Sequence, residues 1–103
     1  PVAATGRRGV NDALTVRHNL EASRFEALVD GQWCVCVYHR TGASLLMTHT
    51  EVPRALEGRG IAAALVQAAL DWARAEGLKV RPHCSYVASY MRRHAETQDL
   101  IDR

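Results

Sequence analysis

The stretch ALEGRGIAAALVQAALDWARAEG, residues 55–77, decides the fold because a loop with two glycines runs directly into a long helical pattern. From residue 61 to residue 76 the polar side chains are spaced four and then three residues apart, at Gln67, Asp71 and Arg74. This spacing forms one narrow stripe on a helix with 3.6 residues per turn. Gly77 suits the left-handed position that ends a helix. The stretch therefore predicts a helix that is covered on most sides and lies across a sheet.

The sequence before this helix alternates apolar and polar residues in short runs, which is the period of a β-strand. Between two of these runs, Asp30-Gly31 is typical of a tight hairpin. The other connections are also short, so we expect an antiparallel meander. The four expected strands cover residues 14–19, 24–30, 32–40 and 44–52.

The sequence after the helix predicts a fifth strand at LKVRP, residues 78–82, and a second helix over residues 85–94. A strand–helix–strand unit from residue 44 to residue 82 makes a right-handed crossover, so the fourth and fifth strands should be parallel. The expected fold class is α+β, or mixed α/β. It consists of the meander, the central helix packed on the sheet, a parallel fifth strand and a C-terminal helix. We expect one domain over residues 13–103, preceded by a flexible tail over residues 1–12.

The composition is that of an ordinary globular protein, with 48% hydrophobic and 23% charged residues among 103. A net charge of +2 is too weak to indicate nucleic acid as a partner. No apolar run approaches the roughly 18 residues of a membrane span, and no signal-peptide pattern is present. Cys34 and Cys36 are two apart on an expected strand, which indicates two buried thiols on one face rather than a metal site. We expect a cytoplasmic protein with no membrane, metal or nucleic-acid partner.

The two glycines at the helix start, Gly58 and Gly60, indicate a binding site for an anion. The first four amides of a helix have no partner within it, and the helix dipole makes that end positive. Small residues let a phosphate approach those amides, and Arg54 and Arg59 add positive charge. Ile61 after Gly60 excludes a Walker A loop. A flexible turn before a buried helix remains the alternative.

The run EGRGIA (57–62) followed by ALVQAALDWARAEGLKV (64–80) resembles motif A of the GNAT superfamily of acyl-CoA N-acetyltransferases. The flanks HTEVP (49–53) and PHCSYVASYMRRH (82–94) resemble the small single-domain branch of that superfamily. The motif usually reads Gln/Arg-x-x-Gly-x-Gly/Ala, and here Glu57 stands where Gln or Arg is usual.

The resemblance implies that acetyl-CoA is the cofactor, that its pyrophosphate binds the loop amides, and that its thioester lies where the fourth and fifth strands splay apart. The residues that it implies for binding coenzyme A are Val52, Gly58, Arg59, Gly60, Ile61 and Ala62.

Catalytic candidates begin on the fourth strand, where His49 and Glu51 are two apart and so share a face. The same period places them on the face of Leu45 and Met47, at the edge of an apolar surface. A carboxylate there can act as a base at neutral pH, and the resemblance gives Glu51 that role. His49 is a second base or a proton relay. Both could equally be solvated residues near a strand end.

Two further candidates lie at the second helix. Cys84 precedes this helix, and a thiol at a helix N-terminus has a stabilised thiolate. It could carry the acetyl group covalently or be a buried thiol beside the cofactor. Tyr86 and Tyr90 are one turn apart. The resemblance implies a tyrosine that protonates the departing thiolate, and Tyr90 fits the spacing better.

The sequence thus predicts an acetyl-CoA-dependent N-acetyltransferase acting on a primary amine. Larger members of the superfamily that the chain resembles use an N-terminal helical region for the acceptor site, whereas here the link between the first two strands is only residues 20–23. The resemblance therefore implies a shallow acceptor site suited to a protein tail or a small polyamine, and this small size favours the alternative below. A non-catalytic module that binds or senses coenzyme A is the alternative. A structural domain whose glycines only make a turn is a third reading.

Overall fold

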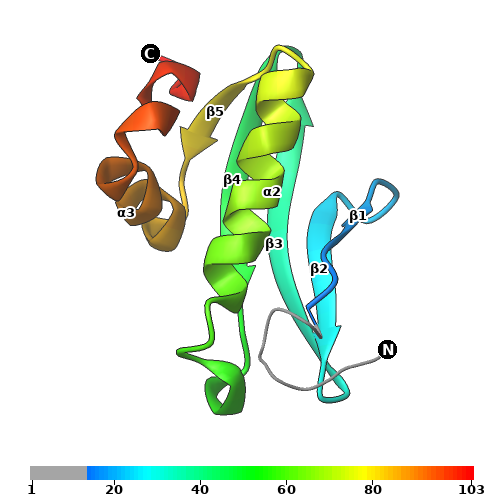
Figure 1. The fold of residues 1–103 in the computed structure, drawn as a ribbon. Helices are drawn as coiled ribbons and strands as arrows, with labels where there is room; N and C mark the ends of the chain where they lie inside the picture. The colour runs from blue at the N-terminus through cyan, green and yellow to red at the C-terminus, as the bar shows by residue number, and fades with distance from the viewer. Residues whose placement is uncertain (1–13) are drawn as a thin grey trace.

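The computed structural model describes residues 14–103, so the tail expected over residues 1–12 and the domain boundary at residue 13 lie outside the described part. Within residues 14–103 the fold consists of a five-stranded sheet and two α-helices (Figure 1). In chain order the elements are β1 (Arg17–Asn19), β2 (Arg24–Val29), β3 (Gln32–Thr41), β4 (Ser44–Glu51), the 3-10 helix η2 (Arg54–Leu56), α2 (Ile61–Ala75), β5 (Lys79–Pro82), α3 (Ser85–Arg93) and the 3-10 helix η3 (Ala95–Leu100).

The sheet has the strand order β1-β2-β3-β4-β5, antiparallel from β1 to β4 and parallel between β4 and β5. This confirms the mixed α+β class and the crossover. Asp30 and Gly31 form the expected two-residue turn, with φ of 51° and 74°. The first strand is shorter than predicted and begins at Arg17 instead of residue 14, because its ladder with β2 ends at the Arg17–Glu26 pair. The 3-10 helix η3 was not predicted.

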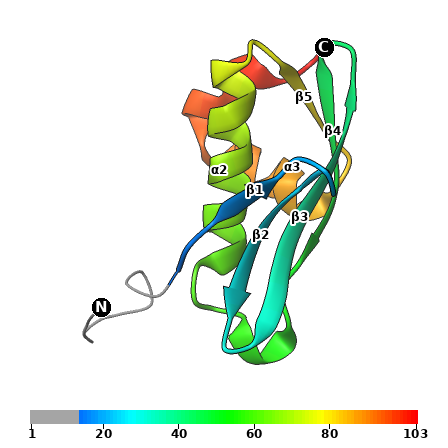
Figure 2. The same cartoon turned by 90° about the vertical axis from the view of Figure 1, so that its right-hand side faces the viewer.

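The helices α2 and α3 lie on the same side of the sheet. Figures 1 and 2 show α2 running across β3 and β4 on this side, and α3 packs beside α2 against β4 and β5. The helix α2 buries six side chains against the sheet and α3: Ile61, Leu65, Val66, Ala69, Leu70 and Ala73. Its polar stripe meets η3, because Arg74 forms an ion pair of 2.8 Å with Asp99. The helix that the sequence predicted is therefore the element around which the core is built.

The two faces of the sheet differ in what covers them. The face under α2, which we call the helix face, carries Cys34 and Cys36, and both are fully buried as expected. The opposite face, which we call the open face, carries Leu28 and Trp33, whose exposed fractions are 53% and 47%. No helix of residues 14–103 packs on the open face, since α2 and α3 share the other side.

A β-bulge in β4 changes which residues share a face. Met47 pairs with Tyr38 and His49 pairs with Val37, so Thr48 has no partner on β3. An extra residue of this kind resets the alternation of side chains. Leu45 and Met47 therefore point into the core, whereas His49 and Glu51 lie on the open face. The prediction that all four share one face was wrong, because a strict period of two cannot anticipate an inserted residue.

Candidate functional site

The strands β4 and β5 separate halfway along β4. Their parallel ladder ends at the Met47–Pro82 pair, and beyond it the Cys84 amide donates a backbone hydrogen bond of 2.9 Å to the Met47 carbonyl. β4 continues to Glu51, while the chain after Pro82 turns into α3. The far half of β4 therefore has no strand on its β5 side among the described residues.

A cavity of about 530 Å³ lies beyond this separation, within the usual size range of ligand pockets. Its wall is formed by the far half of β4, the loop before α2, the first turn of α2 and the start of α3. The lining residues are Thr50, Glu51, Val52, Leu56, Glu57, Gly58, Gly60, Ile61, Ala62, Ala63 and Tyr86. Five of the six residues implied for coenzyme A binding are among them, and Arg59 is the exception.

The N-terminus of α2 opens into this cavity without a cap. Gly60 is the N-cap in the left-handed conformation (φ 79°), no side chain of the described residues caps the helix, and its first turn holds no acidic residue. The first bond inside the helix runs from the Ala64 amide to the Gly60 carbonyl at 3.1 Å. The amides of residues 61–63 are therefore left for another acceptor. A Cβ on Gly58 or Gly60 would meet no protein atom within 4 Å, so the space before the helix is open.

The charges at the loop differ from the expectation. Arg59 forms an ion pair of 3.2 Å with Asp30 in the β2–β3 turn, and it does not line the cavity. Glu57 does line the cavity. Attraction for an anion would thus come from the backbone amides and the helix dipole rather than from Arg59.

His49 and Glu51 lie together at the end of β4. His49 Nε2 and Glu51 Oε1 are 3.2 Å apart, and the two side chains are 58% and 68% exposed. Glu51 also lines the cavity, so this carboxylate stands at the border between the cavity and the open face. The pair can bind an amine or move a proton there.

Cys84 is the N-cap of α3, as predicted, and contacts Thr50, which lines the cavity. Its thiol donates to Thr50 Oγ1 at 3.5 Å, and the Thr50 hydroxyl is 3.8 Å from the Cys36 sulfur. Partial burial raises the pKa of the Cys84 thiol, but its hydrogen bonds with the Thr50 side chain and with the backbone of Thr50 and of the start of α3 together outweigh burial and lower the pKa. Burial raises the pKa of Cys36 to about 11. Cys84 is therefore the more reactive of these two thiols.

The two tyrosines of α3 have different surroundings. Tyr86 lines the cavity. Tyr90 is 4% exposed, its hydroxyl donates to Gln67 Oε1 on α2, and its ring stacks on His94. Burial raises the pKa of the Tyr90 hydroxyl. The catalytic role expected for Tyr90 stays a prediction, and Tyr86 is the tyrosine with access to the cavity.

Within residues 14–103 no helix is long and apolar enough to cross a membrane, and no group of three or more His, Cys, Asp or Glu side chains is arranged to hold a metal ion.

Comparison with known proteins agrees with this geometry. Residues 24–100 match the model of a family described as GCN5-related N-acetyl-transferase. The chain belongs to this family. It is 34% identical over 90 residues to Protein NATD1 of Mus musculus, covering 84% of the chain and 82% of that protein. Protein NATD1 of Homo sapiens is also 34% identical over 90 residues, with 84% of the chain and 80% of that protein covered.

The fold is also similar to a solved structure. A GCN5-like protein from Staphylococcus aureus, determined in solution by NMR, superimposes with a TM-score of 0.71 at 22% identity. The match covers 87% of the chain and 89% of that protein. At this identity the likeness supports the fold alone, and it agrees with the mixed sheet and central helix described above.

The sequence alone did not indicate two residues that line the cavity, Thr50 and Leu56. Thr50 could not have been found, since its position beside Cys84 depends on the bulge at Thr48.

Proposed function

We propose that the chain is an acetyl-CoA-dependent N-acetyltransferase that acts on the primary amine of a protein tail or a small polyamine. The observation that carries this proposal is the cavity that joins the uncapped start of α2 to the gap between β4 and β5. Free helix amides suit a pyrophosphate, and an adjoining gap between strands suits a narrow pantetheine arm. Membership of the family, which typically uses acetyl-CoA, supports the same reading.

The residues at the helix start fit the cofactor. The free amides of residues 61–63 would donate hydrogen bonds to the pyrophosphate oxygens, and the glycine at position 58 keeps the approach open. Val52 and Ile61 supply apolar wall to the cavity. When bound, acetyl-CoA supplies an acetyl group activated as a thioester.

Transfer to an amine forms one C–N bond and breaks one C–S bond, so the chain must accept an amine proton and return a proton to the thiolate. Glu51 accepts the amine proton, and His49 hydrogen-bonds the Glu51 carboxylate and holds it at the cavity edge. Tyr86 and Cys84 stand near the cavity on the α3 side and are the candidates for returning a proton. Tyr90 could serve only if its hydroxyl left Gln67.

A module that binds coenzyme A without catalysis is the second candidate function. The observation that favours it is the surroundings of the catalytic candidates. His49 and Glu51 are more than half exposed, and the Tyr90 hydroxyl is occupied. Catalytic groups act most strongly where water is excluded, so these groups would depend on a bound acceptor to exclude it.

The test is calorimetric titration of the full chain with acetyl-CoA, using Gly60→Tyr and Gly42→Tyr as a matched pair. Both glycines have positive φ (79° and 60°), so both substitutions strain the backbone, but only Gly60 lines the cavity. We expect the unsubstituted chain to bind acetyl-CoA with a micromolar dissociation constant. Gly60→Tyr should raise this constant by roughly 100-fold or more, whereas Gly42→Tyr should change it by no more than about threefold. No binding by the unsubstituted chain would sink the proposal.

Catalysis is tested separately by the release of free thiol from acetyl-CoA with a panel of primary amines. Release that depends on the amine supports the enzyme. Tight binding of acetyl-CoA without any amine-dependent release supports the module instead.

A further inference from the structure

The open face of the sheet carries an arrangement of side chains that the proposed reaction has not used. At the end of this face near the β2–β3 turn, Leu28 on β2 is directly opposite Trp33 on β3. Directly opposite residues of an antiparallel pair have Cβ atoms roughly 4.5–5.5 Å apart, so the two side chains form one apolar surface. They are 53% and 47% exposed and are the largest exposed apolar side chains of β1–β5.

This apolar surface lies beside the carboxylate that we assign as the base. Glu51 on β4 is opposite Val35, and Trp33 is two residues along β3 from Val35 on the same face. Diagonal neighbours of this kind are roughly 7–8 Å apart. Because Glu51 also lines the cavity, the apolar surface leads directly to the place where an amine would react.

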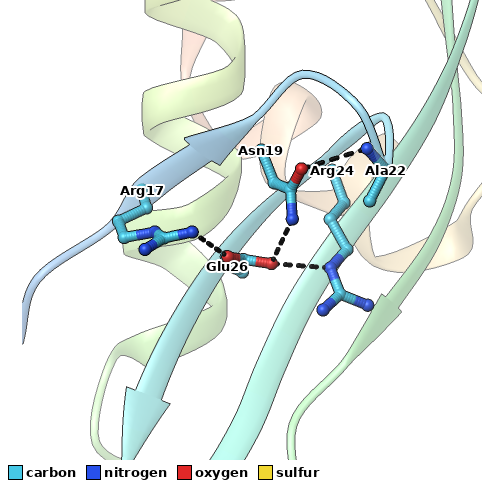
Figure 3. A network of polar contacts seen from close by, with 5 residues as sticks. All are labelled: Arg17, Asn19, Ala22, Arg24 and Glu26. Carbon is cyan, nitrogen blue, oxygen red and sulfur yellow. Dashed lines mark hydrogen bonds and ion pairs between the residues drawn. The ribbon is translucent and has the colours of Figure 1, made fainter.

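The side of the open face formed by β1 and β2 carries positive charge, opposite to the charge of Glu51 (Figure 3). Arg17 on β1 and Arg24 on β2 both bind the buried Glu26 carboxylate, at 2.9 and 2.7 Å, and Asn19 donates to the same carboxylate at 3.2 Å. Two arginines on one carboxylate leave one formal positive charge, and the Arg17 side chain is 66% exposed. Arg24 also lies 5.8 Å from the centre of the Trp33 ring.

From β4 to β1 the open face therefore runs from an acidic end through an apolar middle to a basic end. Neighbouring strands are about 4.8 Å apart, so β4 and β2 are separated by about 10 Å. An extended peptide rises about 3.3–3.6 Å per residue and would cross that distance in about three residues.

We propose, resting on the function proposed above, that the open face binds the acceptor as an extended peptide whose amine lies at Glu51. A large apolar side chain two to three residues from the amine packs on Leu28 and Trp33. An acidic residue beyond it faces Arg17 and Arg24. A polyamine fits this surface poorly, because it has no apolar side chain and Arg17 repels its second charge.

The test compares acetylation of matched pentapeptides with a free N-terminal amine. Three peptides are alanine throughout, apart from glutamate at position 5 and one leucine at position 2, 3 or 4. Three further probes are the peptide without leucine, the peptide without leucine that carries arginine instead of glutamate at position 5, and spermidine. We expect leucine at position 3 or 4 to lower KM roughly tenfold, the size expected for one apolar side chain leaving water. Arginine at position 5 should raise KM.

The variants are Trp33→Ala and, as a matched control, Leu20→Ala. Leu20 is 68% exposed in the turn after β1, away from the cavity lining. Trp33→Ala should remove the advantage of the leucine peptides while leaving the KM for acetyl-CoA and for the peptide without leucine unchanged. Leu20→Ala should change none of these values. Equal KM for all peptides, an equal effect of both variants, or a preference for spermidine would overturn the proposal.

A titration monitored by NMR separates this proposal from the proposed function. The probe is the pentapeptide with leucine at position 3, added to the full chain in the presence of coenzyme A. We expect shifts at the Trp33 indole and the Leu28 methyl groups, including in a preparation that transfers no acetyl group. If transfer occurs but these signals do not move, the proposed acceptor surface is wrong and the proposed acetyltransferase activity stands. If the signals move without transfer, the surface stands and the enzyme claim fails.

Discussion

The two halves of β4 use the same strand for opposite purposes. Leu45 and Met47 pair with both neighbouring strands and are fully buried in the core. Four residues after Met47, Glu51 has a strand on one side only and lines a cavity. One unpaired residue, Thr48, lies between the two halves. A single inserted residue can thus turn a structural strand into part of a candidate site, because it reverses the faces and bends the strand where its partner ends.

The largest effect of a substitution should come from the second half of β4, which holds Glu51. We expect Glu51→Gln to lower kcat by roughly 10²–10⁴-fold. Gln keeps the size of the side chain but cannot accept the amine proton. The dissociation constant for acetyl-CoA and the unfolding free energy should stay close to those of the unsubstituted chain, because the Glu51 side chain is 68% exposed. Steady-state kinetics and calorimetry measure the two parts. Unchanged kcat would contradict the assignment of the base.

The first half of β4, which holds Leu45 and Met47, should contribute mainly to the stability of the fold. Leu45→Ala removes a fully buried side chain and should lower the unfolding free energy by about 2–5 kcal/mol. His49→Ala changes an exposed side chain and should stay within about 0.5 kcal/mol. Urea denaturation followed by circular dichroism gives both values. Similar losses for the two variants would break the distinction between the halves.

The boundary itself can be tested by deleting Thr48. Without it, Met47, His49 and Thr50 would continue the ladder with Tyr38, Val37 and Cys36 in regular register. We expect the unfolding free energy to change by less than about 1 kcal/mol, because Thr48 is exposed and buries no side chain.

Acetyl-CoA affinity should nevertheless fall by roughly tenfold or more on this deletion, since the bend that separates β4 from β5 is lost. Thr48→Ala keeps the bulge and is the matched control, with both quantities unchanged. A deletion variant that binds acetyl-CoA normally would show that the bulge does not shape the cavity.

The smallest effect concerns the two thiols that share Thr50. The pKa of Cys84 is lowered from its ordinary value of 9.0 and that of Cys36 is raised to about 11. The thiolate fraction of Cys84 should therefore rise at lower pH than that of a free thiol, and iodoacetamide should label Cys84 before Cys36. Mass spectrometry of a pH series from 6 to 10 measures this. Thr50→Val should move the midpoint for Cys84 upward, because the hydroxyl that stabilises the thiolate is removed.

Much of the fold could be predicted because local patterns and tertiary contacts agree along most of the chain. The helix from residue 61, the Asp30-Gly31 hairpin and the parallel fifth strand all follow from periodicity, turn chemistry and crossover handedness. The 3-10 helix η3 could not, because it is held by a tertiary ion pair between Arg74 and Asp99. The start of β1 likewise depends on where its ladder with β2 begins, because β2 itself continues past Glu26 to Val29.

By itself, the sequence determined the uncapped, glycine-flanked start of α2. Two glycines before an apolar helix leave free amides wherever that helix is packed, because those groups belong to the helix end and need no distant partner. Only the tertiary structure decided the rest of the candidate site. It directed Arg59 to Asp30, placed Tyr86 rather than Tyr90 at the cavity, and turned Glu51 to the open face. Each of these outcomes depends on contacts between segments far apart in the chain, or on an inserted residue that no local period predicts.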